Sequence, residues 1–212
     1  MTEPWDIIVV GAGSAGIPTA ICAAERGAKV LQLEADEKIG GTLFLSSGQI
    51  SAAGTKRQKK LGIVDSAEDH YVDAQRIAGN TIDPLLGRLA IDHAGSTYDW
   101  LESLGYEPIK AHPVTAGAHE PYLTRRYHWA ETAATHILDV LRPVHSKLIA
   151  KGSIDLQLNT RMTKLLSDGS GAVTGVEAIS SGSLEQYNHI LTVCRLHFSL
   201  FLFLFWILFG SQ

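Results

Sequence analysis

Three glycines and one glutamate near the start of the chain have the types and spacing needed to hold phosphate and ribose groups. Gly11, Gly13 and Gly16 form the pattern G-x-G-x-x-G directly after a short apolar run, and Glu34 closes the next one. The first glycine permits a tight turn, the second lets the backbone approach a pyrophosphate, and the third allows close helix packing. A carboxylate at Glu34 can accept hydrogen bonds from both ribose hydroxyls. The pattern predicts a dinucleotide site that includes Gly11, Gly13, Ser14, Ala15, Gly16 and Glu34.

The elements that must position these residues are two strands and the helix between them. The β-branched run 6–10 and the run 29–33 predict the strands, and a helix is expected to begin near Gly16. The N-terminus of that helix offers unpaired N–H groups and a positive dipole end to phosphates. We therefore predict an α/β fold of Rossmann type, with the two strands adjacent and parallel and the glycine-rich crevice at their carboxyl ends.

A second stretch of small residues bears on which dinucleotide is bound. A nicotinamide-binding domain would continue with alternating strands and helices, whereas the segment 46–55 is rich in Gly, Ser and Ala. Such a segment favours backbone that lies against a large flat ligand, and a flexible loop is the alternative. The further cofactor contacts predicted here are Gly41, Thr42, Ser47, Gly48, Gln49, Ala53 and Gly54.

With these motifs the chain resembles flavoproteins of the succinate dehydrogenase and fumarate reductase superfamily. It is most similar to the soluble fumarate-reductase-like and ketosteroid-dehydrogenase-like FAD proteins, over roughly residues 5–180. The resemblance implies an FAD that lies extended along these loops and transfers hydride at flavin N5 to or from an activated C–C bond. Membrane-bound members attach FAD through a His followed by Thr. This chain has Leu45-Ser46-Ser47 there, so the resemblance implies a non-covalent FAD.

The remaining length is assigned by pattern and by the same resemblance. Residues 1–182 are predicted to be an incomplete FAD-binding domain, in which 107–123 is a proline-rich loop and 154–179 a small β-meander. Helices are expected over 66–78, from Asp83, from Ser96 and over about 130–150. In the resembling family a residue near the start of the meander contacts the adenosine, and Met162 is the matching position.

The catalytic residues are the part that the sequence leaves open. Resembling enzymes take their catalytic Arg and substrate-binding residues from a capping domain after the meander. Nothing in this chain matches them, so we expect a truncated protein whose capping domain is largely missing. His119, Arg125 and Arg126 are weak candidates, because a cationic pair near flavin could bind a carboxylate substrate or an anionic flavin. The alternative is that the two arginines are surface residues at a helix start.

Composition narrows the partners and the compartment. The net charge of −4 gives no sign of nucleic-acid binding. The two cysteines lack C-x-x-C spacing and the nine histidines lack ligand spacing, so a reducing compartment and no metal are expected. No signal peptide precedes the first predicted strand. These features predict a cytoplasmic protein that acts on an unidentified small molecule.

Residues 183–212 form an atypical hydrophobic tail that holds five of the six phenylalanines. It could be an aberrant C-terminus. It could instead be a membrane anchor over 190–209, since about 20 apolar residues span a bilayer. The third alternative is a buried strand followed by a disordered end. Two functions are therefore kept open, an FAD-dependent oxidoreductase and a non-catalytic nucleotide-binding fragment with the tail as a membrane tether.

Overall fold

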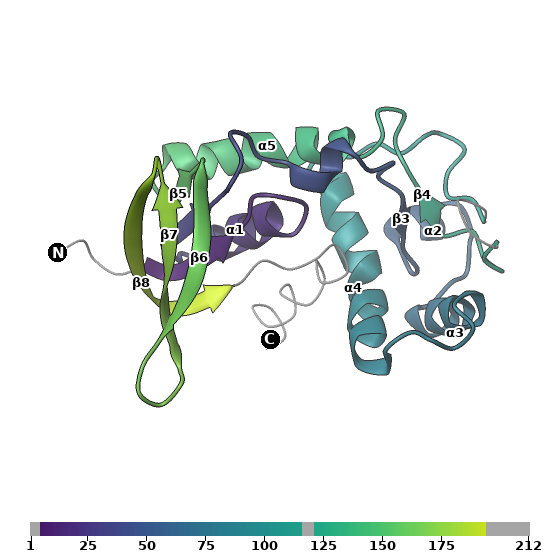
Figure 1. Ribbon diagram of the computed structural model, residues 1–212. Helices are drawn as coiled ribbons and strands as arrows, with labels where there is room; N and C mark the ends of the chain where they lie inside the picture. The colour runs from purple at the N-terminus through teal and green to yellow at the C-terminus, as the bar shows by residue number, and fades with distance from the viewer. Residues whose placement is uncertain (1–4, 116–120, 194–212) are drawn as a thin grey trace. The chain divides into compact units, whose positions relative to one another are not determined.

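The computed structural model describes residues 5–115 and 121–193, which fall into two compact units. Unit 1 holds the described residues of 1–42 and 141–198, and unit 2 holds those of 43–140. Figure 1 labels most of the elements of both. Those of unit 1 are β1 (Trp5–Val10), α1 (Gly16–Glu25), β2 (Val30–Leu33), the part of α5 (Thr135–Ala150) from Leu141, β5 (Ile154–Gln157), β6 (Thr160–Ser167), β7 (Val173–Ser180) and β8 (Ser183–Val193).

The sheet of unit 1 has the strand order β5-β2-β1-β8-β7-β6. Strands β1 and β2 are adjacent and parallel, with Ile7 opposite Val30 and Val10 opposite Leu33. The βαβ unit predicted from the glycine motif is therefore confirmed. Its α1 crossover brings the carboxyl ends of β1 and β2 to the same edge of the sheet, which is where ligands bind in this type of fold.

The β-meander differs from the one predicted over 154–179. Strand β5 pairs in parallel with β2, with Ile154 opposite Val30. The antiparallel meander consists instead of β6, β7 and β8. The reason is that β5 follows the helix α5, and a helical connection returns the chain to a parallel position. A short apolar run does not reveal which strand will be its partner, so the sequence placed the meander one strand too early.

Strand β8 accounts for the first part of the atypical tail. Its first half pairs antiparallel with β7, and its second half pairs in parallel with β1, where His189 lies opposite Trp5. Residues 190–193, which open the predicted 20-residue membrane span, therefore belong to a strand. The rest of the tail, 194–212, lies outside the described residues. No helix among the described residues is long and apolar enough to span a bilayer.

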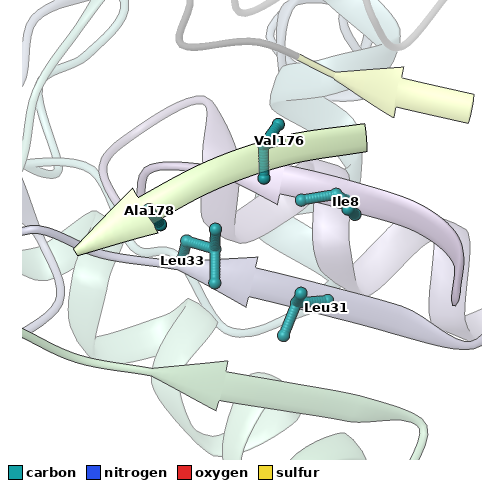
Figure 2. Packing of buried hydrophobic residues seen from close by; sticks show 5 residues of the cluster. All are labelled: Ile8, Leu31, Leu33, Val176 and Ala178. Atoms are coloured by element: carbon teal, nitrogen blue, oxygen red, sulfur yellow. The ribbon is translucent and has the colours of Figure 1, made fainter. Parts of the chain in front are cut away.

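One hydrophobic cluster of unit 1 lies between the parallel strands and the meander. Figure 2 shows side chains of β1 and β2 turned toward those of β7. The cluster consists of Ile8, Leu31, Leu33, Val176 and Ala178, none more than 1% exposed. A fully buried Leu or Ile contributes about 1.5–3 kcal/mol, so this layer fixes the strands that carry the glycine turn.

Helix α1 is buried along almost all of its length. Every residue from Ile17 to Ala24 is buried, and small residues such as Ala20 allow close packing on β1 and β2. Pro18 sits in the first turn, where a missing N–H costs nothing. No side chain caps the N-terminus of this helix.

Unit 2 is mainly helical, and three of its helices begin with side-chain caps. Thr55, Ser66 and Asp83 each accept a hydrogen bond from a backbone N–H of the helix that follows. The caps predicted at Ser66 and Asp83 are confirmed. The elements are the end of the 3₁₀ turn η1 (Gly41–Phe44), β3 (Ile50–Ser51), α2 (Lys56–Lys60), α3 (Ala67–Ile77), α4 (Pro84–Ser103), β4 (Tyr127–His128) and the start of α5.

Helix α4 is one continuous helix where the sequence predicted two. Ser96, expected as the cap of a separate helix, donates its hydroxyl to the carbonyl of His93 within α4. The helix continues through the preceding Gly95, and close packing at this position requires a residue without a side chain. A Cβ there would lie 2.3 Å from the carbonyl oxygen of Ala53. The roughly 1 kcal/mol cost of a mid-helix glycine is thus offset by close contact with the backbone of the small-residue segment.

Candidate cofactor site

The turn between β1 and α1 is held tightly at its two ends. Gly11 has φ +105°, and its N–H donates to the carbonyl of Leu33 at 2.7 Å. A Cβ at Gly16 would lie 1.9 Å from the carbonyl oxygen of Gly11. The first glycine is therefore required by backbone conformation and the third by close packing of the helix start on the turn.

Gly13 has neither of these reasons to be glycine. Its φ is not positive, and the nearest atom to a Cβ built there is the carbonyl oxygen of Gly40, at 4.0 Å. The protein leaves open space in front of this residue. A bound diphosphate needs such space to approach the backbone, so the residues of the turn fit a dinucleotide.

The N–H groups around this space are open as well. Those of Gly13, Ser14 and Ala15 donate to no other group among the described residues. Ala15 provides no side-chain cap, and the first turn of α1 contains no acidic residue. Four N–H groups at a helix start lack intrahelical partners, and together with the helix dipole they attract an anion.

Glu34 lies at the carboxyl end of β2, directly beside the turn. Its Oε2 accepts the N–H of Ala12 at 2.6 Å, and its Oε1 accepts the N–H of Asp36 at 2.9 Å. A carboxylate has about four acceptor positions, so two remain for ribose hydroxyls. The side chain is only 9% exposed. The two backbone hydrogen bonds fix its direction before any ligand arrives.

The residues after β2 return to the same turn. Gly40 donates its N–H to the carbonyl of Ala12 at 2.7 Å, and a Cβ at Gly41 would lie 3.4 Å from the Cα of Gly13. Thr42, the next predicted contact, is exposed. The structure therefore brings Gly41 beside the glycine turn, as the predicted site requires.

Met162 lies near the start of β6. That strand begins beside Glu34, since Thr160 donates its N–H to the carbonyl of Glu34 at 2.8 Å. Met162 itself is half-buried and packs against the core cluster of unit 1. Its contact with the cofactor stays a prediction.

The predicted cofactor residues of unit 2 have contacts of their own. Gly48 has φ +67°, and a Cβ there would lie 2.5 Å from the Cα of Ala134. Gln49 accepts the hydroxyl of Tyr127 at 2.9 Å. Ser47 is exposed, Ala53 is buried, and Gly54 is half-buried with φ +71°. Close packing within unit 2 thus explains Gly48, and the cofactor contacts of this segment stay predictions.

The three catalytic candidates are placed very differently. Arg126 is buried, and its guanidinium donates twice to Asp65, at 2.9 and 2.6 Å, and once to Asp73, at 2.6 Å. It lies directly before β4 and is not a surface residue. Arg125 is exposed, and its carbonyl accepts from Gln58 at 2.8 Å. His119 lies outside the described residues.

Two polar residues of unit 1 were missed by the sequence analysis. Gln32 and His145 are both 0% exposed and hydrogen-bonded to one another. The available signal was the position of Gln32, a polar residue between Leu31 and Leu33 in the apolar run. Among residues 5–115 and 121–193, no group of three or more His, Cys, Asp or Glu side chains is placed to hold a metal ion.

Comparison with known sequences gives relatives over most of the chain. Residues 6–195 match the family described as FAD binding domain. The chain is 33% identical over 182 residues to "Fumarate reductase (cytochrome)" of Shewanella frigidimarina, an alignment that covers 81% of this chain and 29% of that protein. It is 28% identical over 188 residues to "Urocanate reductase" of Eggerthella lenta, with 89% and 30% covered. The chain thus spans less than a third of the length of these relatives.

Solved structures show the same fold. The open conformation of a flavocytochrome c3 fumarate reductase superposes with a TM-score of 0.77 at 26% identity, over 91% of this chain and 33% of that one. A 3-ketosteroid dehydrogenase from Rhodococcus jostii RHA1 shares the fold, with a TM-score of 0.71 at 23% identity, over 92% and 47%. The chain therefore belongs to the FAD binding domain family of the fumarate-reductase-like flavoproteins, and FAD is its cofactor.

Proposed function

We propose that this chain is the FAD-binding part of an oxidoreductase that transfers hydride between flavin and an activated C–C bond of a small organic substrate. Support for FAD comes from the family, and support for hydride transfer comes from relatives named as reductases. The observation that carries the proposal is the open space at Gly13, bordered by free N–H groups and by the fixed carboxylate of Glu34.

In this proposal each residue of the turn has a separate task. The N–H groups of Gly13, Ser14 and Ala15 and the dipole of α1 bind the diphosphate. Glu34 accepts the hydroxyls of the adenosine ribose. When bound, FAD supplies hydride transfer at N5 of its isoalloxazine ring. Leu45-Ser46-Ser47 offers no His for a covalent bond, so the cofactor is held by these contacts alone.

The substrate side of the site requires residues other than Arg126. Its guanidinium is already paired with Asp65 and Asp73, so a substrate carboxylate would have to displace one of them. Arg125 stays a candidate because its side chain is exposed. The engagement of Arg126 favours the second function, a non-catalytic nucleotide-binding fragment. One experiment separates the two.

The test is FAD titration of the full 212-residue chain, followed by anaerobic reoxidation of the reduced flavin. We expect quenching of FAD fluorescence on binding, release of all FAD on acid precipitation, and reoxidation by an unsaturated organic acid. Glu34→Ala should weaken binding by about 10–100-fold, whereas Glu37→Ala, an exposed carboxylate nearby, should not. Binding without reoxidation by any such acid would favour the non-catalytic fragment. Absence of FAD binding would contradict both functions.

A further inference from the structure

Gln32 is a buried amide in the middle of an otherwise apolar strand. It is 0% exposed, and its neighbours Val30, Leu31 and Leu33 are all buried hydrophobic residues. Strands buried on both faces are normally apolar throughout. A buried amide without partners costs free energy, so its presence here calls for hydrogen bonds that use both of its ends.

Both ends of the amide have partners within unit 1. Its Nε2 donates to the carbonyl of Gly11 at 3.0 Å, and its Oε1 lies 2.7 Å from Nε2 of His145, on α5. The carbonyl of Gly11 can only accept, so the amide nitrogen must face it. The amide oxygen then faces His145, whose Nε2 must carry the proton. One orientation of the amide and one tautomer of the imidazole satisfy the chain of contacts.

The hydrogen bonds from His145 through Gln32 end at the carbonyl of Gly11, the first residue of the glycine turn. β2 holds Gly11 on both sides, because Leu33 accepts its N–H and Gln32 donates to its carbonyl. A Cβ at Gly16 would lie 1.9 Å from this carbonyl oxygen and 3.4 Å from Nε2 of Gln32. The direction of this one peptide group therefore sets how the turn leads into α1.

We propose that Gln32 and His145 are positioning residues for the diphosphate site. His145 fixes the amide of Gln32, and the amide holds the Gly11 carbonyl so that the N–H groups of residues 13–15 stay aligned on one point. Neither side chain touches the ligand. The inference rests on the proposed FAD binding. It places a determinant of FAD affinity between β2 and α5, where Gln32 contacts His145.

Stability alone gives no reason for this pair. Replacing two hydrogen-bonded buried polar groups by apolar groups of similar shape is often neutral or stabilising. A Met at position 32 has nearly the shape of Gln and belongs to the same apolar layer as Val30. A purely structural role therefore predicts unchanged cofactor binding once the apolar replacement folds, whereas a positioning role predicts a folded protein that binds poorly.

The test uses the full chain and two readouts, FAD affinity and amide hydrogen exchange of the peptide that contains residues 11–16. The variants are Gln32→Met, His145→Leu, the double variant, and His145→Gln, whose amide nitrogen can replace the imidazole Nε2 as donor. Ile154→Val serves as the matched control, since Ile154 is 1% exposed and lies opposite Val30 on β5, a strand that does not pair with β1.

We expect Gln32→Met to raise the Kd for FAD about tenfold, the effect of one misplaced hydrogen-bonding group. In the cofactor-free protein, exchange of the Gly11 and Ala12 amides, whose N–H groups donate to Leu33 and Glu34, should rise as well. The double variant should be no worse than Gln32→Met, and His145→Gln should restore both readouts. Ile154→Val should leave both unchanged.

Two results would overturn the inference. One is a folded Gln32→Met variant whose 11–16 peptide exchanges its amide hydrogens at the same rate as in the wild type. The other is the same rise in Ile154→Val, which would mark a general loss of stability. Failure of the proposed function can be told apart from failure of this inference. If the wild-type chain does not bind FAD, hydrogen exchange still measures whether Gln32 and His145 hold the turn.

Discussion

The start of α1 in unit 1 and the starts of α2, α3 and α4 in unit 2 differ in how their backbone N–H groups are satisfied. Each helix has backbone N–H groups without intrahelical partners. In unit 2 the side chains of Thr55, Ser66 and Asp83 satisfy some of them. At α1 no side chain does, and the adjacent Gly13 leaves open space. The proposed binding site is therefore distinguished by backbone N–H groups that the described residues leave without an acceptor.

The glycines of the two units show the same contrast. Gly48 and Gly95 are glycine because another part of unit 2 lies within 2.5 Å of the Cβ they lack. Gly13 has no neighbour of that kind. Close packing of the chain on itself thus explains Gly48 and Gly95, whereas the proposed approach of FAD would explain Gly13. Only the structure separates these two reasons.

The largest expected effect comes from acid, and it compares the two units directly. Burial lowers the pKa of His70 to about 4 and of His128 to about 3 in unit 2, and lowers the pKa of His145 to about 4 in unit 1. Because these values lie below the unfolded value near 6.5, the unfolded chain binds protons first as pH falls. Stability should be constant above about pH 6.5 and should fall by on the order of 1 kcal/mol per histidine and pH unit toward pH 4.

Urea denaturation at pH 7, 6, 5 and 4 (roughly one unit apart, across the window of these pKa values) measures this effect. Peptide-resolved hydrogen exchange assigns it to a unit, and unit 2 should open first because it holds two of the three histidines. Removing one group by His128→Phe should flatten the pH dependence. A stability that rises on acidification would contradict the assignment of neutral buried histidines.

The next largest effect separates the two adjacent arginines. Arg126→Ala would leave Asp65 buried without its cation and Asp73 with Arg76 alone, at a cost of about 3–5 kcal/mol. Arg125→Ala is the matched control, since its side chain is exposed and its loss should change stability by less than about 0.5 kcal/mol. Urea midpoints of the two variants provide the comparison. Equal midpoints would show that the buried ion pairs do not stabilise unit 2.

A smaller effect tests the glycine that packing explains. Gly48→Ala places a Cβ 2.5 Å from the Cα of Ala134 at a residue with φ +67°, so we expect a loss of about 1–3 kcal/mol. Gly62→Ala is the control for backbone conformation alone, because its φ is +66° but nothing lies within 4 Å of its Cβ. The difference between the two variants isolates the packing part. No difference would remove the packing explanation for Gly48.

The smallest effect tests the caps. Ser66→Ala removes the side chain that accepts the N–H of Asp69 at 3.1 Å, and about 1 kcal/mol of stability should be lost. Ser96→Ala is the control, because Ser96 lies inside α4 and only donates to His93. Thermal melting of both variants measures the difference. An equal loss would mean that Ser66 does not act as a cap.

The sequence predicted those parts of the molecule whose causes are local. The turn at Gly11–Gly16, the parallel strands and the cap at Ser66 each follow from residues close together in the chain. The partner of β5 and the continuity of α4 through Gly95 depend on contacts with distant segments, and there the prediction was wrong. Periodicity carries no information about such partners.

The residues of the candidate site show the same difference between local and distant causes. Glu34 was predicted because its place after a strand is a local signal. Arg126 was weighed as a surface or substrate-binding residue because its carboxylate partners, Asp65 and Asp73, lie 61 and 53 positions away. The role of Gln32 was invisible for the same reason, since His145 lies 113 positions away. Burial of a polar group can be interpreted only when its partners are known.

The Gly13→Ala variant, measured for both stability and FAD affinity, tests whether the space at Gly13 exists for the cofactor. A Cβ there meets nothing closer than Gly40 at 4.0 Å, so the free energy of unfolding of the cofactor-free protein, measured with urea, should stay within about 0.5 kcal/mol of wild type. The Kd for FAD should rise at least about tenfold, because the methyl group occupies the approach of the diphosphate. An unchanged Kd, or a loss of stability without FAD, would contradict the account.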